Sequence, residues 1–215
     1  MSGTEYFVSG IDTGCGKTYA TGRLASVLLK KGARVITSKL IQTGCHGISE
    51  DIERHRELMA LPLLPQDRQG LTCPYVLKFP ASPHLSASIE KIKVDIGLVR
   101  KAMEKLKETY EIVLCEGAGG LMVPLTRDYL TIEYIREHQL PLILVSSSKL
   151  GSINHTLLSL LACKAHQVHL HALLYNQWPN DDPLIASDSF EVIAAYVKRH
   201  HPKAHVWHTN RLDEV

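Results

Sequence analysis

The sequence GIDTGCGKT at residues 10–18 places glycines, a lysine and a threonine in the order of a phosphate-binding loop. Glycines let backbone N–H groups turn toward phosphate oxygens, and the positive end of a following helix favours an anion. In such a loop Lys17 contacts the terminal phosphates of a nucleoside triphosphate, and the Thr18 hydroxyl binds Mg²⁺. One extra residue separates the outer glycines compared with the generic motif, and Gly14 can supply part of the turn. The alternative is a glycine turn that happens to precede Lys-Thr.

A glutamate followed by small residues supplies the second chemical signal. Glu116 comes directly after the apolar segment Ile112–Cys115 and before the run GAGG. Ligands in open α/β sheets bind at the carboxyl ends of strands, so this carboxylate is expected beside the phosphate loop. Mg²⁺ prefers oxygen ligands, which makes Glu116 a candidate metal ligand. The alternative is a solvated glutamate in a turn at the end of the sheet.

Lys39, Thr43 and Asp51 follow another predicted strand, Arg34–Ser38. A lysine and a hydroxyl at the carboxyl end of a strand suit an anionic substrate or a transferring phosphoryl group. A surface lysine is the plain alternative for Lys39. Asp51 is a candidate second Mg²⁺ carboxylate, although a helix cap at residues 49–51 explains it equally well.

The segment SKLGSINH at residues 148–155 runs from a loop into an apolar helix predicted at Ser152–Ala165. The unpaired N–H groups at such a helix start can hold a carboxylate or a phosphate. An ordinary helix cap is the alternative. The histidines at 166, 169 and 171 fit neither one helix face nor a zinc motif, so we expect no metal there.

Strand-like and helix-like segments alternate along the chain. The predicted strands are Glu5–Ser9, Arg34–Ser38, Tyr75–Phe79, Ile112–Cys115, Pro141–Ser146, Ala172–Tyr175 and His205–His208. The predicted helices are Lys17–Lys31, Asp51–Leu61, Asp95–Tyr110, Thr131–His138, Ser152–Ala165 and Ser189–His200. Prolines predict irregular structure from Pro62 to Gly70 and again after Pro80. The alternation predicts an α/β fold, a parallel sheet with helices on both faces, in a single domain spanning residues 1–215. With the phosphate loop at residues 10–18, the expected fold is of the P-loop nucleoside triphosphatase type.

Composition narrows the class of protein further. Among 215 residues, 24 Lys and Arg balance 22 Asp and Glu, which argues against a dedicated nucleic-acid binder. The five cysteines include no C-x-x-C pair, which disfavours a disulfide scaffold and a zinc ribbon. No apolar run approaches the roughly 20 residues of a membrane-spanning helix. We therefore expect a cytoplasmic protein with no nucleic-acid or membrane partner.

Taken together and in this order, the motifs resemble those of dethiobiotin synthetases, enzymes of the biotin pathway. The resemblance spans nearly the whole chain and rests on YFVSGIDTGCGKT, the segment from Lys39 to Thr43, CPY at 73–75, SPH at 82–84, EGAGG at 116–120, KLGSINH at 149–155 and the strand that ends in Asn176. The extra residue in the phosphate loop is a feature of this family. The resemblance implies a fold shared with nitrogenase iron proteins and MinD-like partition ATPases, and a homodimer.

The resemblance also implies a reaction: joining CO₂ to 7,8-diaminononanoate with ATP and Mg²⁺ to give dethiobiotin, ADP and phosphate. A substrate amine captures CO₂ as a carbamate, and a carbamate oxygen attacks the γ-phosphate. The neighbouring amine then attacks the carbamic–phosphoric anhydride and closes the cyclic urea. Positioning and charge stabilisation dominate phosphoryl transfer, which agrees with a sequence that carries no catalytic-triad motif.

Carried over residue by residue, the resemblance assigns four kinds of role. The catalytic residues are Thr13, Lys17 and Lys39. The nucleotide contacts are Gly14, Cys15, Gly16, Lys17 and Thr18, with Asn176 against the adenine. The metal ligands are Thr18, Asp51 and Glu116, with Glu50 or Glu53 as an alternative to Asp51. The substrate contacts are Thr43 at the carbamate, and Gly151, Ser152 and Asn154 at the start of a helix that receives the substrate carboxylate across the dimer interface.

Two other classes of protein share part of this pattern. A partner-stimulated ATPase switch of the MinD or partition type explains the phosphate loop and Glu116, but it does not explain Lys39, SPH and KLGSINH together. A nucleotide-sensing module explains the loop alone, and it binds ATP without turnover. The three classes differ in what stimulates phosphate release from ATP: a small diamine for the ligase, a partner protein for the switch, and nothing for the sensing module.

Overall fold

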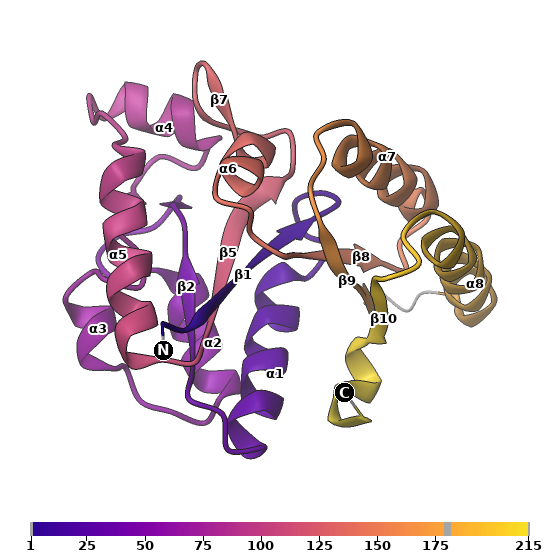
Figure 1. Cartoon of the computed structure of the whole chain (residues 1–215). Helices are drawn as coiled ribbons and strands as arrows, with labels where there is room; N and C mark the ends of the chain where they lie inside the picture. Colours follow the sequence, from indigo (N-terminus) through magenta and orange to yellow (C-terminus); the bar gives the residue numbers. More distant parts are fainter. Residues whose placement is uncertain (1, 179–181, 215) are drawn as a thin grey trace.

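A six-stranded parallel sheet runs through the centre of the protein (Figure 1). A computed structural model of the chain describes residues 2–178 and 182–214. The strands lie in the order β10-β9-β8-β1-β5-β2. Their bounds are β1 Thr4–Gly10, β2 Val35–Lys39, β5 Ile112–Gly120, β8 Leu142–Ser147, β9 Leu170–Asn176 and β10 His205–His208. Each neighbouring pair in this sheet is parallel, which confirms the predicted α/β fold.

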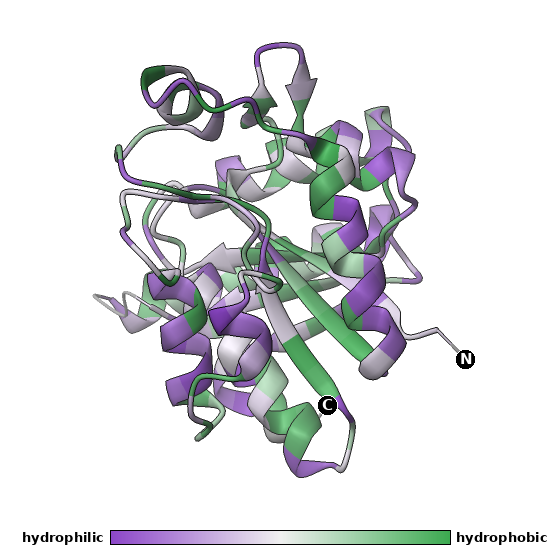
Figure 2. Ribbon diagram, turned by 90° about the vertical axis from the view of Figure 1, so that its left-hand side faces the viewer, coloured by the Kyte–Doolittle hydropathy of each residue, from purple (hydrophilic) through white to green (hydrophobic). Residues whose placement is uncertain are grey.

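Helices cover both faces of the sheet. They are α1 Lys17–Lys30, α2 Glu50–Leu58, α3 Pro65–Arg68, α4 Pro83–Ile89, α5 Ile96–Thr109, α6 Thr131–Glu137, α7 Ser152–Ala165 and α8 Pro183–His200, with a 3₁₀ segment, η1, at Thr209–Glu214. Successive side chains of a strand point to opposite faces. Phe7 of β1 therefore packs in one apolar core with Met103 of α5 and Leu160 of α7, whereas Val8 packs in the other with Leu24 of α1. Figure 2 shows the apolar strands enclosed between helices whose outer positions are polar.

Parallel register brings charged side chains to one edge of the sheet. Glu116 of β5 lies opposite Val8 of β1 on one side and opposite Lys39 of β2 on the other. β1 ends at Gly10, where the phosphate loop begins. The carboxyl ends of three adjacent strands thus deliver the loop, a lysine and a carboxylate to one place, as the sequence predicts.

Proline accounts for three differences from the predicted elements. The stretches expected to be irregular contain the short helices α3 and α4, which begin at Pro65 and Pro83. The prediction is wrong there because proline suits the first turn of a helix, where its missing N–H has no partner to lose. α8 begins at Pro183 rather than at Ser189, because the carboxylate of Asp182 accepts hydrogen bonds from the first backbone N–H groups of the helix.

Two pairs of short strands lie outside the main sheet. β3 (Gln42–Thr43) pairs in parallel with β4 (Val76–Leu77), which lies inside a predicted strand. β6 (Pro124–Thr126) pairs with β7 (Tyr129–Leu130) in a hairpin that the sequence pattern does not predict. Segments of two or three residues are too short to carry a readable period.

The structure bears on the membrane segments and on the cysteines. Within residues 2–178 and 182–214, no helix combines the length and hydropathy needed to cross a bilayer. All five cysteines are free and buried. Burial raises the pKa of the Cys73 thiol to about 12, which keeps it protonated and weakly nucleophilic at neutral pH.

A buried ion pair ties α2 to the segment that follows it. Arg56 is 1% exposed, and its guanidinium donates to both carboxylate oxygens of Asp67 at 2.9 and 2.8 Å. The same guanidinium donates to the hydroxyl of Thr37 on β2 at 2.8 Å. Asp67 also accepts from the Leu64 N–H and the Thr72 hydroxyl. Burial alone raises the pKa of Asp67, but these donors outweigh it and hold the pKa below its ordinary value of 3.8.

We expect Asp67→Asn to lower the free energy of unfolding by about 3–5 kcal/mol at pH 7, because it leaves the Arg56 charge buried without a counter-charge. The depressed pKa makes this contribution complete above pH 3.8 and lost as the pH falls below that value, so the two proteins converge in acid. Urea unfolding at a series of pH values measures both effects. Glu57→Gln is the control, because the Arg54–Glu57 pair is exposed, and it should change stability by less than about 1 kcal/mol. Equal losses in the two variants would contradict the prediction.

Candidate active site

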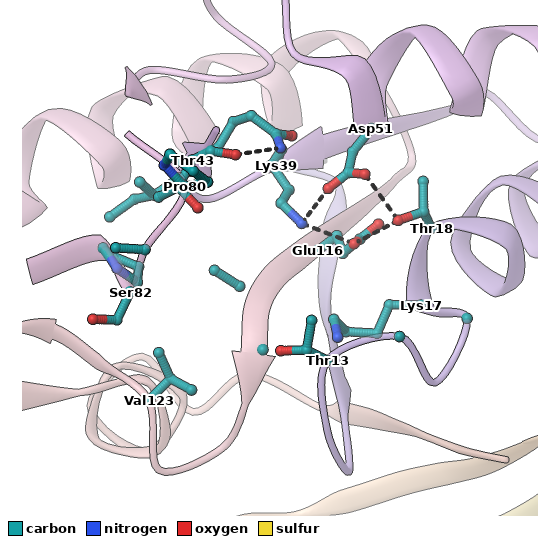
Figure 3. Close-up of a pocket in the computed structure, with 18 of the residues that line it drawn as sticks. Thr13, Lys17, Thr18, Lys39, Thr43, Asp51, Pro80, Ser82, Glu116 and Val123 are labelled. Atoms are coloured by element: carbon teal, nitrogen blue, oxygen red, sulfur yellow. Dashed lines mark hydrogen bonds and ion pairs between the residues drawn. The ribbon is translucent and has the colours of Figure 1, made fainter. Parts of the chain in front are cut away.

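A cavity of about 800 Å³ opens at the carboxyl ends of β1, β2 and β5 (Figure 3). The predicted site residues that line it are Thr13, Gly14, Gly16, Lys17, Thr18, Lys39, Thr43, Asp51 and Glu116. Figure 3 shows the phosphate-loop side chains on one wall and Thr43 with Pro80 and Ser82 on another, with open space between them. One cavity therefore gathers the residues that the sequence predicts for phosphate, metal and carbamate.

The phosphate loop joins β1 to α1 and is shaped for an anion. Gly14 and Gly16 have φ angles of 75° and 88°, in the left-handed region that favours glycine. A Cβ on Gly16 would lie 2.0 Å from the Asn176 amide nitrogen, so this glycine also permits a close approach. No side chain caps α1 and no acidic residue lies in its first turn, which leaves the helix N–H groups available to phosphate oxygens. Lys17 is buried, and its ammonium donates to the Asp12 carbonyl at 2.9 Å.

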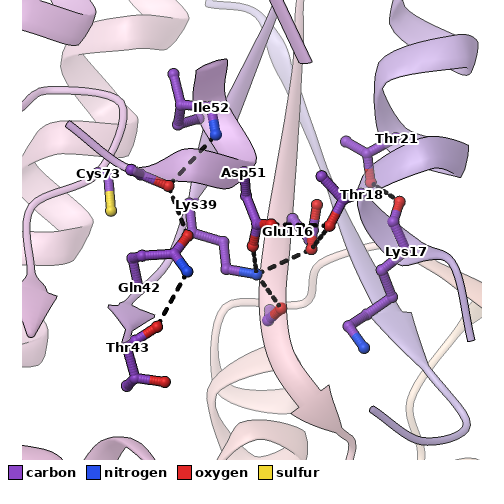
Figure 4. Close-up of polar contacts among 12 residues, drawn as sticks. Lys17, Thr18, Thr21, Lys39, Gln42, Thr43, Asp51, Ile52, Cys73 and Glu116 are labelled. Carbon is purple, nitrogen blue, oxygen red and sulfur yellow. Dashed lines mark hydrogen bonds and ion pairs between the residues drawn. The ribbon is translucent and has the colours of Figure 1, made fainter. Parts of the chain in front are cut away.

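Four side chains form a polar cluster beside the loop (Figure 4). The Lys39 ammonium lies 2.5 Å from Asp51 Oδ2 and 2.9 Å from Glu116 Oε1. It donates a third hydrogen bond to the Gly117 carbonyl at 3.1 Å. The Thr18 hydroxyl lies 3.0 Å from Asp51 Oδ1 and 3.1 Å from Glu116 Oε1. The two carboxylates thus face a lysine and a threonine at the same time.

Charge pairing sets the protonation states in this cluster. Lys39 is 5% exposed and Glu116 is fully buried. Burial disfavours the charged lysine, but the Coulomb attraction of Glu116 and Asp51 outweighs it and raises the Lys39 pKa above its ordinary value. Burial likewise acts to raise the pKa of Glu116, yet Lys39 and a hydrogen bond with His55 hold that pKa well below its ordinary range. Both groups are therefore charged at neutral pH.

The donor set fits Mg²⁺. No group of three or more His, Cys, Asp or Glu side chains among the described residues is arranged for a metal ion, and this holds for the histidines at 166, 169 and 171. The Thr18 hydroxyl instead lies about 3 Å from both an Asp51 and a Glu116 carboxylate oxygen. All are hard oxygen donors, and Mg²⁺ commonly uses one or two carboxylates together with substrate phosphates. Of the three acids considered for the second carboxylate, Asp51 reaches the cluster, whereas Glu50 and Glu53 are exposed.

Asn176 connects the phosphate loop to the last part of the chain. Its side chain is buried, and its amide nitrogen donates to the Cys15 carbonyl at 3.0 Å. Its amide oxygen accepts from the Thr209 hydroxyl at 3.4 Å. A second cavity of about 520 Å³ adjoins it, lined by Gly16, Tyr19, Asn176, Gln177, Trp178 and Asn210. Asn176 thus lies where a base attached to loop-bound phosphates has room, and the adenine contact stays a prediction.

Gly151, Ser152 and Asn154 do not line the main cavity. α7 begins at Ser152 after Gly151, and Ser152 contributes to a separate hollow of about 210 Å³ beside the phosphate loop. Asn154 is exposed. Within one copy of the described chain, these residues are therefore apart from Lys39 and Thr43.

Sequence reasoning missed His55. It lies on α2, fully buried, with Nε2 2.8 Å from Glu116 Oε2. A signal was present, because His55 follows Asp51 by four residues and a helix places both on one face. Burial and the partner across the sheet were not readable from the spacing alone.

The fold and the loop define a P-loop nucleotide-binding protein. Solved structures of similar fold agree: the ParA family ATPase from Chlorobium tepidum has a TM-score of 0.52 at 15% identity, over 89% of this chain and 81% of its own. The structure of pnob8 ParA has a TM-score of 0.55 at 14% identity, over 95% of this chain and 80% of its own. A family model described as an AAA domain matches residues 4–206.

Sequence relatives specify the family. The chain is 49% identical over 200 residues to the ATP-dependent dethiobiotin synthetase BioD of Chlorobaculum tepidum, covering 93% of this chain and 84% of the relative. It is 48% identical over 200 residues to ATP-dependent dethiobiotin synthetase BioD 2 of Haemophilus ducreyi, covering 93% of this chain and 95% of the relative. This chain belongs to the family of ATP-dependent dethiobiotin synthetases.

Asp51→Asn should raise the Mg²⁺ concentration needed for half-maximal activity by about 10- to 100-fold, because a charged oxygen ligand is lost. Titration of Mg²⁺ at saturating ATP measures the shift. Glu50→Gln and Glu53→Gln are matched controls on the same helix turn and should behave like the wild type, since both side chains are exposed. A shift in either control equal to that in Asp51→Asn would contradict the assignment of Asp51.

Proposed function

We propose that this protein is an ATP-dependent cyclo-ligase that carboxylates 7,8-diaminononanoate and closes the ring of dethiobiotin, in biotin biosynthesis. Membership of the dethiobiotin synthetase family supports the proposal. The carrying structural observation is a second buried lysine, Lys39, in the cavity that already contains the phosphate-loop lysine. Binding a nucleotide alone requires one cationic loop. Bringing two anions together in one cavity requires a positively charged group beside each of them.

The nucleotide end of the reaction belongs to the loop and its neighbours. Thr13, the loop glycines and the first N–H groups of α1 receive the phosphates, and Lys17 exchanges its bond to the Asp12 carbonyl for a phosphate oxygen. Thr18, Asp51 and Glu116 hold Mg²⁺, which supplies charge neutralisation at the phosphates when bound. Asn176 contacts the adenine beside the second cavity.

Lys39 and Thr43 serve the carbamate end. A substrate amine and CO₂ form a carbamate, and its oxygen attacks the γ-phosphorus while the bond to ADP breaks. The second amine attacks the carbamoyl carbon, phosphate leaves with the bonding electrons, and the amine proton is lost as the cyclic urea forms. An ammonium has three N–H donors, and Lys39 uses all three on Asp51, Glu116 and Gly117. Contact with the carbamate therefore replaces one of those bonds.

A second copy of the chain completes the site in this proposal. Exposed leucines lie along α7 and just before it: Leu150, in the preceding turn, is 81% exposed, and Leu158 and Leu161 on the helix are 56% and 50% exposed. Apolar side chains gathered on one exposed helix are typical of a contact surface. Gly151, Ser152 and Asn154, at the start of α7, then receive the substrate carboxylate of the partner's site. We propose a homodimer for this reason, with residues 1–215 acting as one domain.

The partition-type ATPase switch is not favoured. Its relatives share the fold at 14–15% identity, a level that supports the fold alone. The nucleic-acid and membrane exclusions and the cytoplasmic location stay predictions from the sequence.

Phosphate release from Mg·ATP should require both the diamine and bicarbonate, and it should match the dethiobiotin formed mole for mole. Phosphate assay and mass spectrometry of the product measure the two sides. Lys17→Ala should lower the rate by about 10²–10³-fold, because it removes charge at the transferring phosphoryl group. Release that continues unchanged without the diamine would exclude the ligase and favour a partner-driven ATPase.

Mixing two inactive variants tests the shared site. Lys17→Ala disables the phosphate loop, and Asn154→Asp places a negative charge where the substrate carboxylate is proposed to bind. In a two-fold dimer each mixed pair contains one site with both halves intact, so a mixture refolded from denaturant should recover about a quarter of wild-type activity. Recovery that stays at the level of the separate variants would show that each chain uses its own helix.

A further inference from the structure

Glu116 divides its two carboxylate oxygens between different partners. Oε1 accepts from the Thr18 hydroxyl and the Lys39 ammonium, at 3.1 and 2.9 Å. Oε2 instead meets Nε2 of His55 at 2.8 Å. His55 is fully buried and does not line the cavity, so it touches the site through Glu116.

The local sequence fixes His55 and Asp51 as one unit. They lie four residues apart on α2, which places both on the same helix face. The Ser49 hydroxyl caps α2 by accepting from the Ile52 N–H. A Cβ on Gly22 of α1 would lie 3.3 Å from the His55 Cα and 2.6 Å from a Leu58 methyl, so a glycine there lets α2 approach α1 closely. One helix thus supplies one carboxylate and orients the other.

The second ring nitrogen of His55 indicates why a histidine is present. An ionised carboxylate oxygen can only accept a hydrogen bond, so Nε2 of His55 donates the hydrogen that joins the two groups. Nδ1 is buried and has no hydrogen-bond partner among the described residues. Burying a polar nitrogen without a partner costs free energy, whereas a leucine would fill similar space without that cost. Among the residues that the structure describes, the hydrogen bond to Glu116 offsets this cost.

We propose that His55 is a positioning residue for the Mg²⁺–nucleotide site: it fixes Oε2 of Glu116 so that Oε1 stays turned toward Thr18. The inference rests on the magnesium site of the proposed function. Partners that orient ligating carboxylates contribute about 10- to 100-fold in metal affinity or activity, although they never touch the metal. His55 acts through Glu116 and contacts neither nucleotide nor substrate.

The test measures ADP affinity by calorimetry with Mg²⁺ and again with EDTA, in the wild type, His55→Leu and His55→Gln. The ratio of the two dissociation constants reports how strongly metal and nucleotide are coupled, without any turnover. His55→Leu should reduce this ratio about 10-fold or more while leaving the metal-free affinity unchanged. His55→Gln keeps an N–H donor of similar reach and should retain most of the ratio. An unchanged metal-free affinity also shows that the phosphate loop is folded.

Two outcomes would overturn the inference. If His55→Leu keeps the wild-type ratio and only melts at a lower temperature, His55 is a packing residue, and the ligase proposal is untouched. If the wild type binds ADP equally well with Mg²⁺ and EDTA, the magnesium site fails and this inference fails with it. Dethiobiotin formation by the wild type is measured separately, so failure of the ligase proposal is distinguishable from either result.

Discussion

A buried carboxylate held ionised at the end of the central sheet is the constraint on which the site depends. Glu116 is fully buried, and an isolated carboxylate there would take up a proton rather than bear the cost of desolvation. The Lys39 ammonium and the His55 ring keep it charged instead. Lys39 and Glu116 are opposite one another in the β2–β5 register, so the pairing of strands creates the ion pair. The register of β2 against β5 therefore determines which charges meet in the site.

This constraint explains what the sequence could and could not predict. The rule that parallel strands bring their carboxyl ends to one edge predicts that Lys39 and Glu116 lie together, and the structure confirms it. The prediction of irregular structure after Pro80 is wrong at Pro83, because proline interrupts helices but is also favoured in their first turn. Asp51 and its acidic neighbours were indistinguishable in sequence, since only the rotation of α2 decides which carboxylate reaches Thr18. His55 was missed because its partner lies 61 residues away in the chain.

The position of the α7 residues follows from the same sheet. β8 and β9 lie on the far side of β1 from β2, so the helix between them starts across the phosphate loop from Lys39. Gly151, Ser152 and Asn154 cannot close over the carbamate end within their own copy while they lie outside its cavity. In the proposed homodimer, the exposed leucines on and before α7 form part of the contact between the two copies, and the partner's helix completes the site.

The two lysines of the cavity have different resting partners. Lys17 donates to one backbone carbonyl of its own loop, a neutral group that a phosphate oxygen replaces with a gain in charge pairing. Lys39 begins with all three N–H donors engaged, two of them on carboxylates. If Lys39 turns toward a substrate, it loses one ion pair with a carboxylate. The free energy of that loss is offset only when the incoming group is also an anion. A neutral amine cannot compensate for the lost pair, whereas its carbamate can. In the proposed reaction, the resting ion pair thereby favours the carboxylated substrate over the free amine, and the carboxylated form is the one that reacts with the γ-phosphate.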